Sequence, residues 1–245
     1  TAEIMSEQGY DALTIDYQHG MISFSDLFTM LQSIRSSGVT PICRVSGLDH
    51  AFISKVMDAG ALGIICPMIN TKKQAEQLVQ DCKYPPLGIR SFGPTRANIT
   101  VSSNYFYESN EGTFCLAMIE TQEAFDNLED IASTPGLDGL YIGTADLTIG
   151  LNQGKLSPGF DRTEPEMIEA KKKILEIAHK HEKVACLHCG TPEYAAKATN
   201  WGFDLVTITN DVRLLSGAAA AHVKKFKELT NQKTDISSET DFNSY

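Results

Sequence analysis

Short apolar runs alternate with segments of helical spacing along nearly the whole chain. The apolar runs end at Gly or another residue that favours turns, which is typical of buried β-strands. This pattern predicts strands at residues 12–16, 40–45, 62–67, 114–119, 138–142, 184–188 and 204–208. Between them, apolar positions that recur every three to four residues predict helices at residues 24–37, 49–59, 71–82, 122–133, 164–181 and 192–201.

The alternation of strands and helices indicates the fold. Strands that are hydrophobic at nearly every position are buried on both faces, as in a parallel sheet covered by helices. A chain of 245 residues has the usual size of a (β/α)₈ barrel. We therefore predict an α/β fold of the TIM-barrel type, with a barrel domain over residues 1–229 and a polar C-terminal tail over residues 230–245.

The predicted sheet has one strand fewer than a closed barrel of this type needs. Seven strands are predicted, and the first residues, TAEIMSEQGYD, have the spacing of a helix. The simplest explanation is that the first strand of the barrel lies upstream of Thr1. The same explanation leaves room for an upstream targeting segment.

Charge and cysteine content narrow the biochemical context. The chain has 31 acidic and 21 basic side chains, a formal charge of −10, and 42% hydrophobic residues. Nucleic-acid surfaces need clustered Lys and Arg, so this balance disfavours a nucleic-acid partner. Six scattered cysteines, mostly inside apolar runs, favour a reducing, cytoplasmic setting. The sequence has no run of about 18 apolar residues, so we expect no membrane span.

Polar side chains follow several of the predicted strands. In a βα barrel the C-terminal ends of the strands meet at one mouth, where the catalytic groups lie. The residues that this rule brings together are Asp16, His19, Arg44, Glu120 and Asp146. The two later carboxylates can supply the hard oxygen ligands that Mg²⁺ or Mn²⁺ prefers. Arg44 can stabilise an enolate oxygen, and His19 can act as a general acid and base.

Each of these residues also has an ordinary structural explanation. A single Glu at a strand end is often a cap or a salt-bridge partner. The segment GTADLTIG is either a plain loop with Asp146 as an N-cap, or a turn whose successive amides bind a carboxylate. The joint placement of these residues at one mouth favours the functional explanation.

Several longer motifs resemble those of one enzyme family. They are IDYQHG, TPICRVSG, ICPMINT, YPPLGIRSFGPTRA, MIETQEAFDNLEDIASTPGLDGLYIGTADL and FDLVTITNDVRLL, in this order between Ala2 and about Ala220. The sequence resembles the HpcH/HpaI aldolases, which are metal-dependent pyruvate aldolases on a TIM barrel. The resemblance implies a divalent cation, Mg²⁺ or Mn²⁺ with Co²⁺ as a further candidate. It also implies reversible cleavage of a 4-hydroxy-2-oxo acid into pyruvate and an aldehyde.

The resemblance assigns roles to individual residues. His19 corresponds to the family's catalytic His, Asp16 to the Asp associated with it, and Arg44 to the Arg that stabilises the enolate. The metal ligands of the family correspond to Glu120 and Asp146.

A further set of residues is implied for substrate binding and for assembly. The backbone of Thr144, Ala145 and Asp146 corresponds to the contacts with the substrate carboxylate. Asp58 corresponds to an Asp that reaches across a subunit contact and raises the basicity of the catalytic His. That role implies a homo-oligomer, in this family typically a hexamer built from two trimers.

Two positions depart from the usual residues of the family. The sequence has DYQH where many members have DGEH, so Gln18 replaces a negative charge beside His19. Met118 occupies the substrate-binding place of a Gln that many members have. We therefore expect the reaction class of the family with a substrate preference of its own.

Three other features have competing explanations. Cys186, His188 and Cys189 suggest zinc, but strand alternation places Cys189 on the opposite face from the other two. Arg90 and Arg96 form either a mobile rim that recognises an acidic aldehyde or ordinary surface arginines on a long loop. The run GAAAAHVKKFKEL predicts a terminal helix that serves both as the last barrel helix and as a contact with a partner subunit.

Other functions are less consistent with these residues. A Schiff-base aldolase needs a buried lysine on a barrel strand, and none of the seven predicted strands contains Lys. A CoA-thioester lyase of the citrate or malyl type would use the same Glu and Asp, but we find no basic surface dedicated to the CoA phosphates. A non-catalytic oligomeric assembly module would not need the complete set of polar residues at the mouth.

Overall fold

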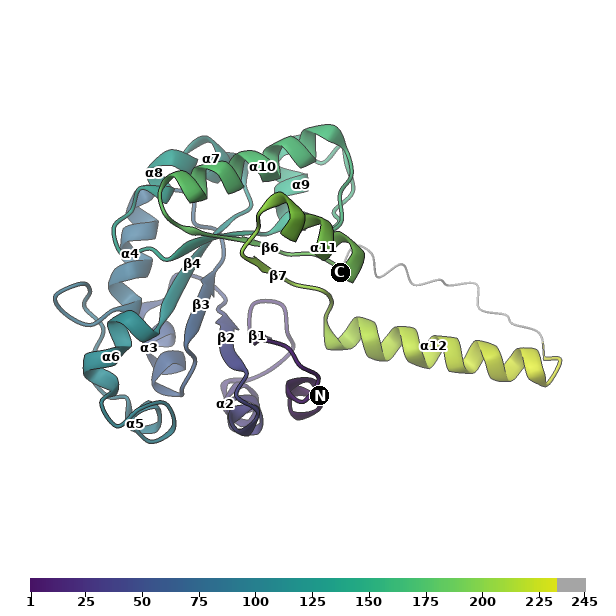
Figure 1. Ribbon diagram of the computed structural model, residues 1–245, viewed down its shortest axis with the longest axis horizontal. Coiled ribbons are helices and arrows are strands. Elements are labelled where there is room, and N and C mark those ends of the chain that lie inside the picture. Colours follow the sequence, from purple (N-terminus) through teal and green to yellow (C-terminus); the bar gives the residue numbers. More distant parts are fainter. Residues whose placement is uncertain (233–245) are drawn as a thin grey trace.

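The structure, a computed structural model that describes residues 1–232, is a curled parallel sheet with helices packed on its outer face (Figure 1). The strands are β1 (Ala12–Asp16), β2 (Thr40–Arg44), β3 (Gly63–Cys66), β4 (Phe114–Ile119), β5 (Gly139–Ile142), β6 (Val184–Leu187) and β7 (Leu205–Val206). They pair in chain order, and all neighbours are parallel. The seven predicted strands are confirmed. Within residues 1–232 no ladder joins β7 to β1, so the sheet is a half-barrel that is open on that side.

Helices connect successive strands and cover the convex face, except that α1 precedes β1 and α12 follows β7 and extends away from the sheet. They are α1 (Ala2–Ser6), α2 (Phe24–Ser33), the 3₁₀ turn η1 (Arg35–Ser37), α3 (His50–Asp58), α4 (Lys72–Cys82), α5 (Thr95–Thr100), α6 (Tyr105–Gly112), α7 (Gln122–Asp126), α8 (Leu128–Ala132), α9 (Thr144–Asn152), α10 (Pro165–Lys180), α11 (Pro192–Trp201) and α12 (Asp211–Leu229). The predicted helical segments are confirmed with small shifts at their ends, and the segment 122–133 is divided at Asn127. Short helices without a long apolar stripe, namely α5, α6 and α9, were not predicted.

Capping residues determine where the strands give way to helices. Ser23 and Thr71 each form a capping box with the third residue of the helix that they begin. Asp49, Thr121 and Thr191 accept a hydrogen bond from a backbone N–H of the first turn. Each helix therefore begins within a few residues of its strand, which leaves short loops at the C-terminal edge of the sheet.

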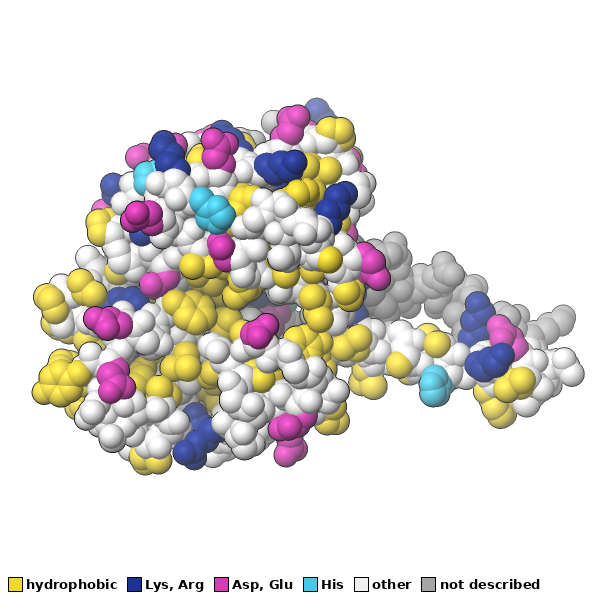
Figure 2. All heavy atoms as spheres, viewed as in Figure 1, with side chains coloured by type: hydrophobic (Ala, Val, Ile, Leu, Met, Phe, Trp, Pro, Cys, Tyr) yellow, Lys and Arg dark blue, Asp and Glu magenta, His cyan; other side chains and the backbone are white. Residues whose placement is uncertain are grey.

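Alternate strand residues face two different cores. The outer core lies between the sheet and the helices and includes Cys43, Ile64 and Leu140. A separate cluster inside the curve of the sheet consists of Ile42, Ile65, Leu116, Met118, Tyr141 and Cys186. Hydrophobic side chains gather in the middle of the face shown in Figure 2, over the strands. Because side chains alternate along a strand, residues two positions beyond this inner cluster also face the concave interior.

The last described helix does not form part of the barrel wall. α12 extends away from the sheet (Figure 1), and none of its residues is buried. Its exposed large apolar side chains are Val212, Leu214, Leu215, Val223, Phe226 and Leu229. The prediction that this helix is the last barrel helix is therefore wrong in this structure, because small residues permit close packing without specifying against what. The predicted polar tail lies outside the described residues from position 233 onward.

Membrane insertion of a helix is not supported. Among the described residues, no helix combines the length and the hydrophobicity needed to cross a bilayer.

Candidate active site

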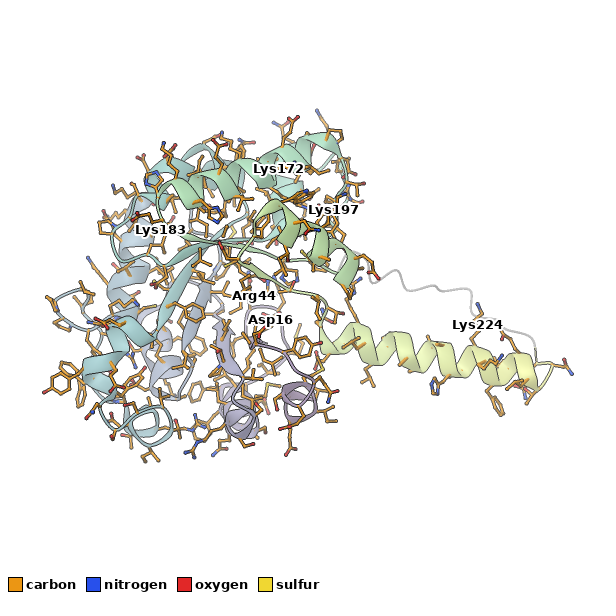
Figure 3. The ribbon with its side chains drawn as sticks, in the orientation of Figure 1. Asp16, Arg44, Lys172, Lys183, Lys197 and Lys224 are labelled. Carbon is orange, nitrogen blue, oxygen red and sulfur yellow. The ribbon has the colours of Figure 1, made fainter. Side chains whose placement is uncertain are left out.

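The last residues of β1 and β2 form an ion pair inside the half-barrel. Arg44 donates from Nε to Asp16 Oδ1 over 2.9 Å and from Nη2 to Asp16 Oδ2 over 2.6 Å. The strand register places the two residues opposite each other, and Figure 3 shows them side by side. Burial by itself would raise the pKa of Asp16, but the hydrogen bonds and charge of Arg44 outweigh it and lower that pKa. The pair therefore stays charged and holds the guanidinium in a fixed orientation.

The turn after β1 is folded around the same carboxylate. Asp16 Oδ1 accepts hydrogen bonds from the backbone N–H groups of Gln18, at 3.1 Å, and His19, at 3.2 Å. A Cβ atom at Gly20 would lie 2.1 Å from the carbonyl oxygen of Asp16, so this turn requires glycine. His19 is exposed at the end of the turn. Asp16 thus positions both the guanidinium of Arg44 and the backbone that carries His19.

Glu120 is a buried carboxylate with one unpartnered oxygen. The residue directly follows β4 and is 1% exposed. Its Oε1 accepts a hydrogen bond from the backbone N–H of Met68 at 2.7 Å, whereas its Oε2 is buried without a hydrogen-bond partner among residues 1–232. Burial raises the pKa of Glu120 to about 7, opposed by the Met68 N–H and assisted by the negative charge of Asp146. A buried oxygen in this state needs another ligand, and a cation is the natural one.

The backbone around Glu120 is shaped to hold it. Met68 has a φ of +58°, in the left-handed region that residues other than Gly rarely adopt, and this conformation accompanies the hydrogen bond from its N–H. A Cβ atom at Gly143 would lie 2.3 Å from Glu120 Oε2 and 2.8 Å from the terminal methyl of Met118. Glycine at position 143 therefore provides the space that the carboxylate occupies.

The GTAD segment begins a helix, so of the two alternatives for this segment the plain loop with Asp146 as its N-cap is wrong. α9 starts at Thr144, with Gly143 as its N-cap and Asp146 in its first turn. The first backbone amides of a helix have no partner within the helix, and the dipole there attracts anions. The hydroxyl of Thr144 donates to the carbonyl oxygen of His188 at 2.9 Å, which ties the start of α9 to the end of β6. Gly143, the N-cap of α9, lies against Glu120, so the free amides of Thr144, Ala145 and Asp146 begin directly after the residue that contacts this carboxylate.

A second polar pair, which the sequence analysis did not identify, lies in the concave interior. The hydroxyl of Tyr141 on β5 is 2.8 Å from Nδ1 of His188, the residue after β6. Burial and the nearby positive charge of Arg44 lower the pKa of His188 to about 4, so its ring is neutral. In sequence, Tyr141 is indistinguishable from an aromatic core residue. The available signal was strand alternation, which puts both Tyr141 on β5 and His188 after β6 on the concave side of the sheet.

The zinc-like motif has no metal-binding arrangement in the described part of the chain. Cys186 belongs to the inner cluster and Cys189 to the outer core, as strand alternation predicts. Burial raises the pKa of Cys189 to about 12. Across residues 1–232, no group of three or more His, Cys, Asp or Glu side chains is arranged to hold a metal ion. Glu120 and Asp146 would therefore need water or substrate oxygens to complete a coordination shell.

Asp58 is not brought to this mouth within one chain. It is the last residue of α3, which runs back from the C-terminal end of β2, so it lies at the opposite end of the sheet. Asp58 Oδ1 accepts a hydrogen bond from Arg90 Nη2 at 2.6 Å, and the Arg90 side chain is fully buried against the rings of Tyr84 and Tyr105. The role of Asp58 toward a partner's His stays a prediction.

For Arg90, both explanations of the arginines in the GIRSFGPTRAN segment are wrong. Arg90 is neither mobile nor at the surface, because it is buried in the pair with Asp58. Arg96 donates to the backbone carbonyls of Ala59 and Leu31. Glycine and proline correctly indicated a loop here, but they gave no information about the groups on which the loop packs.

Comparison with known proteins places this chain in a family. Residues 1–216 match the family described as HpcH/HpaI aldolase/citrate lyase. The chain belongs to this family. It is 39% identical over 218 residues to a hydroxypyruvate/pyruvate aldolase of Rhizorhabdus wittichii, covering 89% of this chain and 86% of that protein. It is 30% identical over 231 residues to a 5-keto-4-deoxy-D-glucarate aldolase of Escherichia coli, covering 93% and 88%.

The fold agrees with solved structures of the HpcH/HpaI family. A crystal structure of a family protein from Burkholderia cenocepacia matches with a TM-score of 0.83 at 25% identity, over 92% of this chain and 89% of that one. The predicted family and the predicted TIM-barrel type of fold are thereby confirmed. The chain is an aldolase, a carbon–carbon lyase of the class II pyruvate type.

Proposed function

We propose that this HpcH/HpaI protein is a metal-dependent aldolase that reversibly cleaves a 4-hydroxy-2-oxo acid into a small 2-oxo acid and an aldehyde. Candidate substrates are 2-keto-3-deoxy sugar acids and 4-hydroxy-2-oxo-diacids, with pyruvate as the 2-oxo acid. The relatives named hydroxypyruvate/pyruvate aldolase support hydroxypyruvate as a second donor. The observation that carries the proposal is the buried, unpartnered Oε2 of Glu120 beside the start of α9.

Glu120 and Asp146 are the residues that would hold the divalent cation. Their carboxylate oxygens suit Mg²⁺ or Mn²⁺, with Co²⁺ as a further candidate. The buried, unpartnered oxygen of Glu120 fits this role because a positive charge would offset the cost of its burial. When bound, the cation supplies a Lewis acid that draws electron density from the 2-oxo group.

The start of α9 would orient the substrate. The free amides of Thr144, Ala145 and Asp146 can donate to the substrate carboxylate, as helix N-termini do for anions. Met118 lies next to Gly143 and belongs to the inner apolar cluster, so the floor of the site is apolar. Such a floor suits the carbon atoms of the 2-oxo acid.

Arg44 would stabilise the negative charge that forms in the reaction, and His19 would transfer the proton. During cleavage, His19 accepts the proton of the C4 hydroxyl, and the C4 oxygen forms the aldehyde carbonyl. The electron pair of the C3–C4 bond moves to C3 and is delocalised onto the C2 oxygen as an enolate. Arg44, held in place by Asp16, stabilises that oxygen. The protonated His19 then delivers its proton, directly or through a water, to C3 of the enolate, which gives the 2-oxo acid, and condensation follows the same steps in reverse.

We also propose that the working form is a homo-oligomer, a hexamer built from two trimers. The segment that carries Arg90 and the helix α6 have exposed apolar side chains at Leu87, Ile89, Phe92, Phe106 and Tyr107, and the rings of the last three contact one another in turn. Contiguous apolar surface of this kind marks interaction sites. The Asp58 side chain is 26% exposed beside it, which would let Asp58 act on the His19 of a neighbouring subunit.

Aldol condensation tests the proposal directly. The protein is incubated with pyruvate or hydroxypyruvate, Mg²⁺ or Mn²⁺ and a panel of aldehydes, and carbon–carbon bond formation is measured. Glu120→Ala and Asp146→Ala should abolish this turnover while the circular dichroism spectrum stays that of the wild type. Turnover that persists in chelator, with pyruvate trapped on the protein by borohydride, would show an imine route instead. Cleavage of a CoA thioester in place of the hydroxy acids would favour a CoA-dependent lyase.

A further inference from the structure

Tyr141 and His188 form a hydrogen-bonded pair inside the half-barrel for which the proposed reaction has assigned no role. Tyr141 is 2% exposed and belongs to the inner apolar cluster, so its hydroxyl is buried. The hydrogen bond that the structure gives this hydroxyl is the one to His188 Nδ1. Burial raises the pKa of Tyr141 far above its ordinary value, so the phenol keeps its proton.

The tautomer of His188 follows from this arrangement. The phenol keeps its proton, and this contact is the hydrogen bond that the structure gives it, so we assign the phenol as the donor and Nδ1 as the acceptor, which puts the single proton of the neutral ring on Nε2. In the sheet register Tyr141 lies opposite Cys186, two residues before His188, so the phenol is deeper in the barrel than the imidazole. Nε2 lies on the far side of the ring from Tyr141, and with this tautomer it carries a donor.

The ring of His188 is held in place from a second side. The Phe160 ring packs against it with a centroid separation of 4.7 Å. The loop that carries Phe160 is anchored by Asp161, which accepts hydrogen bonds from the backbone N–H of Gly190 and the hydroxyl of Thr191, both at 2.7 Å. The imidazole is thus oriented by its neighbours before any ligand binds, which lowers the entropic cost of using it as a contact.

His188 also lies between the two parts of the site that attract negative charge. Its carbonyl oxygen accepts the hydroxyl of Thr144 at the start of α9, and Arg44 is close enough to lower its pKa. We propose that His188, oriented by Tyr141, is a substrate-binding residue whose Nε2–H donates a hydrogen bond to a carboxylate or keto oxygen of the bound 2-oxo acid. Tyr141 is the positioning residue. This inference rests on the proposed aldolase function.

Substitutions at both positions test the pair. His188→Leu removes the donor, and the KM for pyruvate and for hydroxypyruvate should rise about 10-fold to 100-fold, as expected for a lost hydrogen bond to a charged group. His188→Gln places an amide near the Nε2 position and should recover most of this loss. Tyr141→Phe should raise the same KM about 3-fold to 10-fold, because Nδ1 loses its donor. The KM for the aldehyde should stay within about 2-fold in every variant.

A spectroscopic readout separates this role from a structural one. In protein labelled with ¹⁵N-histidine, the wild-type His188 ring should show an unprotonated Nδ1 and a protonated Nε2, and Tyr141→Phe should change this signature. His181→Gln, a substitution at a solvent-facing histidine paired with Glu129, is the matched control and should leave both readouts unchanged. The pH–rate profile should keep its shape in His188→Gln, because the neutral imidazole binds substrate without exchanging a proton with it.

The outcomes distinguish this inference from the function on which it rests. An active wild type, together with folded His188→Leu whose KM for both 2-oxo acids is unchanged, would overturn the inference alone. A ring that carries its proton on Nδ1 would overturn it as well. If His188→Leu does not fold, the conservative Tyr141→Phe variant takes its place, and an unchanged KM for both 2-oxo acids in that folded variant would overturn the inference. A wild type without metal-dependent condensation would overturn the proposed function itself.

Discussion

Replacing the buried Glu120 by Gln should stabilise the metal-free protein at high pH. Burial raises the pKa of Glu120 to about 7 from its ordinary 4.5. Between these two pH values the folded protein keeps a proton that the unfolded chain releases, so the free energy of unfolding falls as the pH rises. The difference of about 2.5 pKa units corresponds to about 3 kcal/mol of lost stability at pH 8.

Glutamine has nearly the shape of glutamate but does not ionise. Its amide oxygen can still accept the Met68 N–H, and its NH₂ group takes the place of the unpartnered oxygen. Glu120→Gln should therefore be more stable than the wild type by about 2–3 kcal/mol at pH 8, and nearly equal to it at pH 4.5. Urea unfolding in the presence of chelator at both pH values measures these differences.

Added metal should reverse the order of stability. Millimolar Mn²⁺ should stabilise the wild type by mass action and leave Glu120→Gln unchanged, because the variant lacks an anionic ligand. Glu169→Gln, at an exposed position on α10, is the control and should differ from the wild type by less than about 0.5 kcal/mol under every condition. A Glu120→Gln protein that is no more stable than the wild type at pH 8 would refute the reasoning that the ionised Glu120 carboxylate destabilises the metal-free protein.

Other substitutions test neighbouring parts of the site. Arg44→Lys keeps a positive charge but loses the two-nitrogen contact with Asp16, so metal-dependent exchange of the C3 protons of pyruvate in deuterated water should fall about 100-fold or more. Normal exchange would exclude Arg44 from enolate stabilisation. Gly143→Ala places a Cβ atom 2.3 Å from Glu120 Oε2 and should weaken Mn²⁺ binding at least about 10-fold by calorimetry. The matched control is Gly112→Ala, whose Cβ would meet nothing within 4 Å. Asp58→Asn removes the carboxylate partner of the buried Arg90 and should lower the free energy of unfolding by about 2 kcal/mol. If Asp58 faces a partner's His19, the kinetic pKa of that histidine should also fall, and an unshifted pH–rate profile in the folded variant would reject the cross-subunit role.

The amino-acid sequence alone determined the features that depend on residues close together along the chain. Periodicity identified all seven strands, because a buried strand is apolar along its own length whatever lies beside it. The positions of Asp16, Arg44 and Glu120 at strand ends were sufficient to place them together, since parallel strands in a barrel end at one edge. The family motifs then indicated the reaction class, which the matching family confirmed.

The tertiary structure decided which distant groups meet. Arg90 pairs with Asp58, 32 positions earlier, and Tyr141 with His188, 47 positions later. Neither contact has a local signal, because the sequence spacing does not say how a loop folds or which side chain fills the interior of a sheet. Likewise, only the three-dimensional positions of the surrounding hydrogen-bond donors show that one oxygen of Glu120 has no partner. For α12 the local signal was sufficient to predict a helix, but its small residues do not specify the surface on which that helix packs.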